Sequence, residues 1–458
     1  MNGLDETTLA ALTPGSSPWR MRAGKVTDVI GTLVRATGVD VRCGDFCELR
    51  TRDGALLQLA EAVGFQGDKV LLMPLAGTAG LSRSTLVVDT GRPLQVRVGP
   101  GLLGRVVDVL GKPIDGKGAV PWASTVDLMR PPPGPMERPM IGTPLVTGIR
   151  CVDALATIGE GQRMGIFAPA GTGKSTLMSM FARGASCDVN VITLIGERGR
   201  EVREFIERVL GPEGMARSVV VCATSDRSAV ERSKAAYVGT AVAEYFRDQG
   251  MKVLLMMDSL TRFARAQREI GLAAGEPPTR RGFPPSVFAE LPRLLERAGR
   301  TEKGSITALY TILSEDETSG DPIAEEVRSI LDGHLLLSRS IAARNRYPAI
   351  DVLNSLSRVM GDVVPRHHAQ QAAQVRRLMS RYQEVETLLR IGEYKAGSDP
   401  LADEAIAKND AINDFLGQAV ESVEPYARTL RSLAALGAGP NGGMTGGMTG
   451  GLDGRLNP

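Results

Sequence analysis

The stretch Ala168-Pro169-Ala170-Gly171-Thr172-Gly173-Lys174-Ser175 decides the fold of this chain. The apolar run of residues 164–167 before it is typical of a buried parallel strand, and residues 176–183 after it follow a helical pattern. A strand, a glycine-rich turn, Gly-Lys-Ser and a helix in this order form a phosphate-binding loop. The alternative is an ordinary glycine-rich turn between a strand and a helix.

The residue types of this loop suit phosphate chemistry. Gly171 and Gly173 allow the backbone N–H groups to turn inward around phosphate oxygens. The start of the following helix adds a positive partial charge. Lys174 is expected to neutralise the β- and γ-phosphates, and the hydroxyl of Ser175 is expected to bind Mg²⁺. Ala168 departs from the motif, because it stands where the first glycine is usual.

Composition limits the classes of protein that need to be considered. A chain of 458 residues is expected to form roughly two to four domains. Lys and Arg number 54 against 52 Asp and Glu, so the net charge of +2 provides no overall basic field for nucleic acid or a membrane. The five scattered cysteines fit reduced thiols. With no signal peptide and no run of ~20 apolar residues, we expect a cytoplasmic protein.

The sequence pattern changes along the chain. Between residues 24 and 88, short β-rich runs separated by glycine-bearing turns predict a small antiparallel barrel or sandwich. The scarcity of aromatic residues there favours a structural collar over a nucleic-acid-binding barrel. From residue 141 to 364, apolar strands alternate with helices, which predicts a doubly wound α/β domain. After Pro365 the pattern is helical.

Two acidic residues follow predicted strands of the α/β domain. Asp258 ends the apolar run of residues 253–257, where an acid can hold Mg²⁺ beside the phosphates. The alternative is that Asp258 caps the next helix. Glu197 follows the strand at residues 189–195, where a carboxylate can polarise the water that attacks the γ-phosphate. A surface salt-bridge cluster at Glu197 agrees equally well with the spacing.

These motifs together resemble a known family. The stretches that carry the resemblance are, in chain order, residues 103–116, Ala168–Ser175, residues 196–201, Asp258-Ser259-Leu260-Thr261-Arg262-Phe263-Ala264, Tyr347-Pro348-Ala349-Ile350-Asp351 and Ser357-Arg358-Val359-Met360. The chain resembles the catalytic subunits of F- and V-type rotary ATPases over residues 23–430. Residues 275–288 and 321–326 resemble the type III secretion and flagellar export branch. Residues 44–50 and 343–346 are more similar to the injectisome enzymes than to the flagellar ones.

The resemblance implies a division of the chain. It predicts a RecA-like P-loop NTPase domain of α/β class, with an N-terminal small β-barrel and a C-terminal helical domain. The expected parts are a flexible N-terminus at residues 1–22, the β-barrel domain at 23–93, the ATPase domain at 94–365, the helical domain at 366–435 and a disordered glycine-rich tail at 436–458.

The resemblance also implies roles for individual residues. Glu197 would activate water, Arg198 would be its neighbour in the site, and Asp258 would be the Mg²⁺-side acid. Tyr347 would stack on adenine, with core packing as the alternative. Arg358 would be an arginine finger donated to the neighbouring subunit, whereas an isolated Arg is most often a solvated surface charge. The residues expected to bind the nucleotide are Ala170, Gly171, Thr172, Gly173, Lys174, Ser175, Thr176 and Tyr347.

The function implied by the resemblance is Mg²⁺-dependent ATP hydrolysis by a homohexamer that energises type III protein export. The expected place is the cytoplasmic base of the apparatus, peripheral to the inner membrane. The expected partners are stator and stalk proteins and chaperone–substrate complexes, without nucleic acid. The alternatives are a flagellar export ATPase, a hexameric RNA-translocating helicase and a non-catalytic nucleotide-binding subunit. Glu197 argues against the last of these, because a silent subunit has no use for a water-activating acid.

Overall fold

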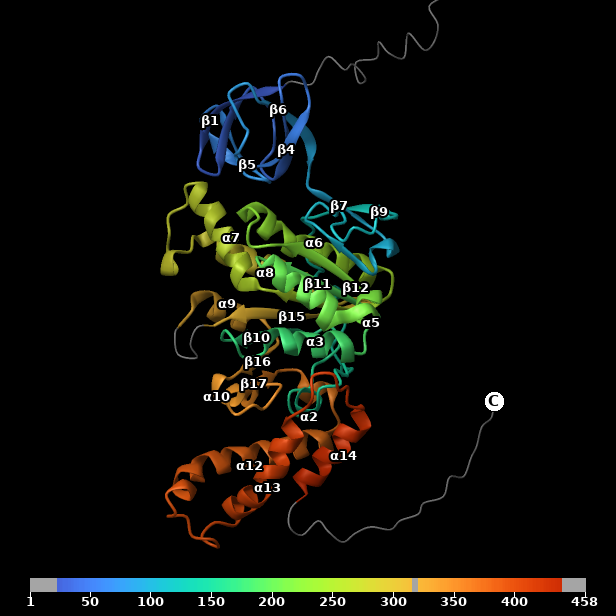
Figure 1. Ribbon diagram of the computed structural model, residues 1–458, viewed down its shortest axis with the longest axis vertical. Coiled ribbons are helices and arrows are strands. Elements are labelled where there is room, and N and C mark those ends of the chain that lie inside the picture. Colours follow the sequence, from blue (N-terminus) through green and yellow to red (C-terminus); the bar gives the residue numbers. More distant parts are fainter. Residues whose placement is uncertain (1–22, 315–319, 439–458) are drawn as a thin grey trace, which may run out of the picture.

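The structure is a computed structural model that describes residues 23–314 and 320–438. Three parts follow one another along the long axis of the molecule (Figure 1): a β-barrel, a sheet flanked by helices, and a group of C-terminal helices. The fold class predicted from the sequence is therefore confirmed. The predictions of a flexible N-terminus and of a disordered tail concern residues that lie almost wholly outside the described ranges.

The N-terminal part is a closed six-stranded barrel with the strand order β1-β2-β5-β4-β3-β6. Its strands are β1 (Gly24–Ile30), β2 (Leu33–Thr37), β3 (Asp45–Arg50), β4 (Leu56–Gln66), β5 (Lys69–Pro74) and β6 (Leu86–Pro93). Alternating side chains point inward, and Val34, Leu49, Ala60, Leu72 and Val87 fill the interior. Closure between β1 and β6 removes the free sheet edges that a sandwich would leave.

The central part is built on a nine-stranded sheet with the order β17-β16-β10-β15-β13-β11-β12-β8, and β14 pairs with β15 beside this path. Its strands are β8 (Arg105–Val107), β10 (Arg163–Ala168), β11 (Val189–Ile195), β12 (Ser218–Ala223), β13 (Lys252–Asp258), β14 (Gly299–Arg300), β15 (Ser305–Leu313), β16 (Gly333–Leu337) and β17 (Ile350–Ser357). The central strands are parallel and mostly apolar, as expected for a sheet covered on both faces. In contrast, β17 runs antiparallel to β16.

Helices cover both faces of this sheet (Figure 1). The helices of the central part are α2 (Arg150–Leu155), α3 (Lys174–Gly184), α4 (Gly199–Glu204), α5 (Gly211–Ala216), α6 (Ala229–Asp248), α7 (Leu260–Ala273), α8 (Pro285–Leu295), α9 (Pro322–Ile330), α10 (Arg339–Ala343) and α11 (Met360–Val363). One hydrophobic core joins one face of the sheet to α6, α7, α8 and α9. A second core joins the other face to α2 and α3.

The C-terminal part consists of α12 (Arg366–Arg390), α13 (Pro400–Leu416) and α14 (Tyr426–Gly437). The helical pattern predicted after Pro365 is confirmed. These helices share the second core, to which they contribute Val375, Phe415 and Leu433. Of the helices in residues 23–314 and 320–438, none is long and apolar enough to cross a membrane.

A buried ion pair holds α6 to the C-terminal end of α8. The guanidinium of Arg297 donates two hydrogen bonds to the carboxylate of Glu244, at 2.7 and 2.8 Å, and one to the carbonyl of Leu128 at 2.7 Å. The two charged side chains are 1% and 3% exposed. Removing Arg297 would leave the carboxylate of Glu244 buried, with the more exposed Arg130, 3.9 Å away, as its remaining ion pair among the described residues.

We therefore expect Arg297→Met to destabilise the protein by about 3–5 kcal/mol, visible as a lower melting temperature in a thermal shift assay. The matched control is Arg293→Met on α8. Arg293 is 71% exposed and pairs with Glu290, so this change should alter stability by ~1 kcal/mol or less. Equal melting temperatures for the two variants would contradict a structural role for the buried pair.

Candidate functional site

The glycine-rich turn between β10 and α3 has the backbone of a phosphate loop. Gly171 and Gly173 adopt φ angles of +80° and +85°, which side-chain-bearing residues rarely adopt. The hydroxyl of Thr172 donates a hydrogen bond to the carbonyl of Pro169 at 2.8 Å and braces the turn. Ala168 is the fully buried last residue of β10 and has no positive φ angle. An alanine therefore fits where the motif usually has glycine.

Lys174, the first residue of α3, contacts two acids that follow neighbouring strands. Its ammonium makes a short ion pair with Oδ1 of Asp258, at the end of β13, and lies 3.7 Å from Oε1 of Glu197, just beyond β11. The carboxyl ends of parallel strands lie along the same edge of the sheet, which brings together residues far apart in the sequence. Thr311 on β15, between β10 and β13, donates a hydrogen bond to Oδ1 of Asp258 at 2.7 Å.

Glu197 lies in a shielded position rather than in a surface cluster. Its side chain is 11% exposed, and Nη2 of Arg262 lies 3.3 Å from Oε1. Burial, and next the negative charge of Asp258, raise the pKa of Glu197 to about 7. A carboxyl with this pKa exchanges protons near neutral pH, as a general base must.

Two alternatives considered for the acids are not seen in the structure. The helix α7 is capped by Ser259, whose hydroxyl accepts a hydrogen bond from the N–H of Arg262 at 3.4 Å. Asp258 therefore does not cap this helix. The surface ion pair in this region is formed by Arg198 and Glu201 at 3.1 Å. The side chain of Arg198 is 76% exposed.

Tyr347 lies at the same sheet edge as the phosphate loop. Its ring packs on the turn so closely that a Cβ added at Gly173 would be 3.2 Å from the ring. Tyr347 is half-buried and lines a cavity of about 880 Å³ that extends to α13. The carbonyl of Tyr347 accepts a hydrogen bond from the N–H of Gln418 at 2.8 Å. The neighbouring Arg346 donates a hydrogen bond to Asn413 on α13 at 2.7 Å.

Arg358 lies at the opposite edge of the sheet, that is, at the ends of the strands that are remote from the phosphate loop. It follows β17, whose last residue Ser357 pairs with Gly333 at the start of β16. Because β16 is parallel to β10, the start of β16 is remote from the edge at which β10 enters the phosphate loop. Arg358 is exposed, and no acidic side chain of the described residues forms an ion pair with it.

The structure thus brings together most, but not all, of the residues expected to form the site. Lys174, Glu197, Asp258 and Tyr347 lie around the phosphate loop. Arg358 lies at the opposite ends of the strands, and the exposed side chain of Arg198 pairs with Glu201. Sequence reasoning missed Thr311 and Arg262. A hydroxyl within the otherwise apolar run at residues 308–313 was the available signal for Thr311.

The oxygen donors at the phosphate loop suit a divalent cation that also binds phosphate oxygens. Among the described residues, no group of three or more His, Cys, Asp or Glu side chains has the arrangement of a metal site. The hydroxyl of Ser175 and the carboxylate of Asp258 are oxygen donors of the kind that Mg²⁺ accepts when phosphates supply further ligands. The donor set therefore fits a metal that arrives with its nucleotide.

Glu197 should lower the stability of the nucleotide-free protein above neutral pH. Since its pKa in the fold, about 7, lies above the ordinary value of 4.5, ionisation is less favourable in the folded than in the unfolded chain. Stability is therefore lost as the pH rises from about 4.5 to about 7. We expect Glu197→Gln to raise the melting temperature at pH 8 by about 2 °C or more.

The same comparison at pH 5 should show a smaller gain, because Glu197 is then largely protonated in the fold. Glu204→Gln is the matched control, since Glu204 lies on the adjoining helix α4 and forms exposed ion pairs with Arg200 and Arg208. A melting temperature that falls on Glu197→Gln at pH 8 would show that the carboxylate is stabilising.

Three protein-family models match successive stretches of the chain. The ATP synthase alpha/beta family beta-barrel domain matches residues 26–91, and the nucleotide-binding domain of that family matches residues 148–357. The T3SS EscN ATPase C-terminal domain matches residues 364–435.

Individual relatives match nearly the whole chain. The type 3 secretion system ATPase of Xanthomonas euvesicatoria is 65% identical, over 94% of this chain and 96% of its own length. The flagellum-specific ATP synthase of Bacillus subtilis is 49% identical, over 91% of this chain and 95% of its own length. The assembled ATPase EscN of the enteropathogenic E. coli type III secretion system superposes with a TM-score of 0.86 at 46% identity, and the match covers 91% of this chain and 100% of that chain. The chain is an ATPase and belongs to the family of type III secretion ATPases.

Proposed function

We propose that this chain hydrolyses ATP with Mg²⁺ as one subunit of a homohexameric ring, and that hydrolysis supports protein export through a type III secretion system. The observation that carries the proposal is the separation of the candidate residues between two edges of one sheet. Lys174, Glu197 and Asp258 lie at one edge and Arg358 lies at the other. A site that uses all four must therefore be formed by two copies.

The residues at the phosphate-loop edge have complementary tasks. The backbone of the turn and Lys174 bind the β- and γ-phosphates. Ser175 and Asp258 would hold Mg²⁺, which supplies charge neutralisation on the phosphate oxygens when bound. Glu197 accepts a hydrogen bond from the attacking water and takes its proton. Thr311 keeps one oxygen of Asp258 in place.

The remaining candidates act at the two ends of the nucleotide. Tyr347 would stack on the adenine, and the cavity beside it provides room for the base. Arg358 of one subunit would reach the γ-phosphate held by its neighbour and stabilise the charge that develops there. Arg198 remains a candidate on sequence grounds alone, since its guanidinium pairs with Glu201 at the surface.

The proposed partners follow from relatives. EscN has been seen in complex with its central stalk EscO, at a TM-score of 0.85 and 46% identity to this chain. We infer an equivalent stalk partner for this chain, together with stator proteins and chaperone–substrate complexes, at the cytoplasmic base of the apparatus beside the inner membrane. Relatives at 65% and 54% identity are secretion-system ATPases, which favours secretion over the flagellar alternative represented at 49%.

Replacement of Glu197 by Gln tests the catalytic proposal. We expect the kcat for ATP hydrolysis to fall by roughly 10²–10⁴, because the water loses its general base. Turnover should be measured over a range of protein concentrations so that assembly is not limiting. Glu204→Gln, which changes an exposed carboxylate on α4, should retain the activity of the unmodified protein. Unchanged turnover in Glu197→Gln would remove Glu197 from its role.

Replacement of Arg358 by Ala tests the shared site. The kcat should fall by about 10³–10⁵, the contribution of an arginine finger. Binding of a fluorescent ATP analogue should stay nearly unchanged, because the phosphate loop of the same subunit is intact. If nucleotide binding is lost instead, Arg358 has a structural task and the proposal of a shared site fails.

A further inference from the structure

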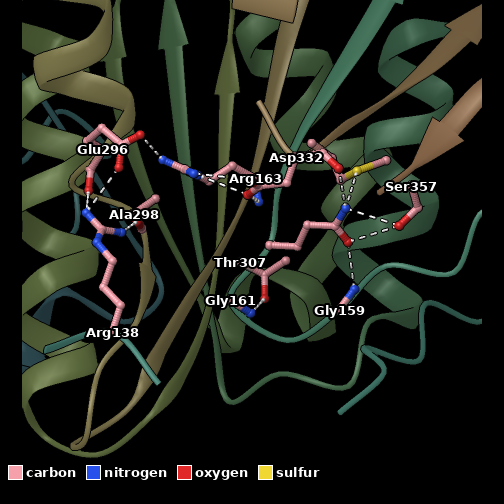
Figure 2. A network of polar contacts seen from close by, with 11 residues as sticks. Arg138, Gly159, Gly161, Arg163, Glu296, Ala298, Thr307, Asp332 and Ser357 are labelled. Atoms are coloured by element: carbon pink, nitrogen blue, oxygen red, sulfur yellow. Dashed lines mark hydrogen bonds and ion pairs between the residues drawn. The ribbon is translucent and has the colours of Figure 1, made fainter. Parts of the chain in front are cut away.

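A network of polar side chains surrounds the segment that precedes Arg358 (Figure 2). The network lies at the sheet edge opposite the phosphate loop, where β10 begins and β17 ends. In Figure 2 it runs from Arg138 and Glu296 through Arg163 to Asp332, and Ser357 lies beside it. Nothing in the phosphate-loop chemistry uses these residues.

The hydroxyl of Ser357 and the backbone of Arg358 are both anchored in this network. Ser357 is buried, and its hydroxyl donates a hydrogen bond to the carbonyl of Thr157 at 2.7 Å and accepts one from Nε2 of Gln162 at 3.1 Å. The N–H of Arg358 donates to the carbonyl of Asp332 at 3.0 Å. Two groups therefore fix the position of Arg358: its own backbone N–H and the hydroxyl of the preceding Ser357.

Gln162 connects these two anchors. Its side chain is fully buried, and Nε2 also donates to the carbonyl of Asp332 at 3.0 Å, the same oxygen that accepts the N–H of Arg358. Its Oε1 accepts a hydrogen bond from the N–H of Gly159 at 2.8 Å. A buried amide with all its bonds made has little freedom to move.

Arg163 holds the turn that carries Asp332. Its guanidinium makes two hydrogen bonds to the carboxylate of Asp332, at 3.0 and 3.1 Å, and an ion pair with Glu296 at 2.5 Å. Paired guanidinium–carboxylate contacts fix geometry more strictly than single contacts do. Arg138, at the outer end of the network, contacts Glu296 and Ala298 but not the segment around Arg358.

We propose that Gln162 and Ser357 are positioning residues for Arg358, and that their hydrogen bonds hold the backbone from which the guanidinium reaches the neighbouring subunit. The proposal rests on the proposed role of Arg358 as a finger. An exposed arginine has several free torsions, so its reach is defined only as well as its backbone is held. A misplacement of about 1 Å in a catalytic group lowers the rate by about 10².

The first test is Ser357→Ala, which removes one hydroxyl from the anchor. We expect the kcat for ATP to fall by about tenfold to a hundredfold while KM and the binding of a fluorescent ATP analogue change little. Gln162→Met is the second variant, because it keeps the length of the side chain while removing its amide. Arg138→Gln is the matched control in the same network, and its kcat should equal that of the unmodified protein.

The second test combines each change with Arg358→Ala. If Ser357 acts through Arg358, the double variant Ser357→Ala/Arg358→Ala should have the same residual kcat as Arg358→Ala alone, within about twofold. If Ser357 instead supports the fold or the phosphate loop of the same subunit, the reductions in kcat caused by the two single changes should multiply in the double variant. The melting temperature of each variant identifies any loss of folded protein.

The outcomes separate the two proposals. A kcat unaffected by Arg358→Ala would overturn the finger itself and the proposed function with it. A large effect of Arg358→Ala, combined with multiplying losses or with no effect of Ser357→Ala and Gln162→Met, would overturn only the positioning role.

Discussion

The direction in which the strands run is the constraint on which the rest of this structure depends. The parallel strands β10, β13 and β11 end at one edge and deliver Lys174, Asp258 and Glu197 to the same place. The antiparallel strand β17 reverses this direction, so Arg358 emerges at the other edge. A single chain cannot bring the two halves together without breaking its sheet. Assembly thereby becomes a geometric requirement for the proposed catalysis.

The charged side chains at the phosphate-loop edge suit catalysis but lower the stability of the nucleotide-free protein. Two carboxylates lie close to a single ammonium group, in surroundings that shield Glu197 from water. Burial and the charge of Asp258 raise the pKa of Glu197 to about 7, which leaves the carboxyl able to accept a proton near neutral pH. At the opposite edge the guanidinium of Arg163 pairs with Asp332 and Glu296, and the buried amide of Gln162 makes hydrogen bonds around the backbone of Arg358. The side chains at the phosphate-loop edge suit catalysis, whereas those at the opposite edge fix the backbone that carries Arg358.

Much of this arrangement could be predicted from sequence, because local patterns specify it. The apolar runs before Lys174 and Asp258 indicated strands, and the pattern after Pro365 indicated the C-terminal helices. The short strand β2 has no such signal, because its five residues include Arg35 and Thr37 and form no long apolar run. Thr311, Arg262 and Gln162 could not be assigned, since their roles depend on contacts across the sheet. The exposure of Arg198 likewise depends on its pairing with Glu201, which spacing alone does not decide.

The central claim is that one chain holds only part of a site. The most direct measurement is ATP turnover per chain across a dilution series, with the mass distribution of the same samples measured in solution with and without an ATP analogue. Turnover per chain should approach zero where monomers dominate and should rise in step with the fraction of assembled rings. Full turnover in samples that contain only monomers would contradict the account.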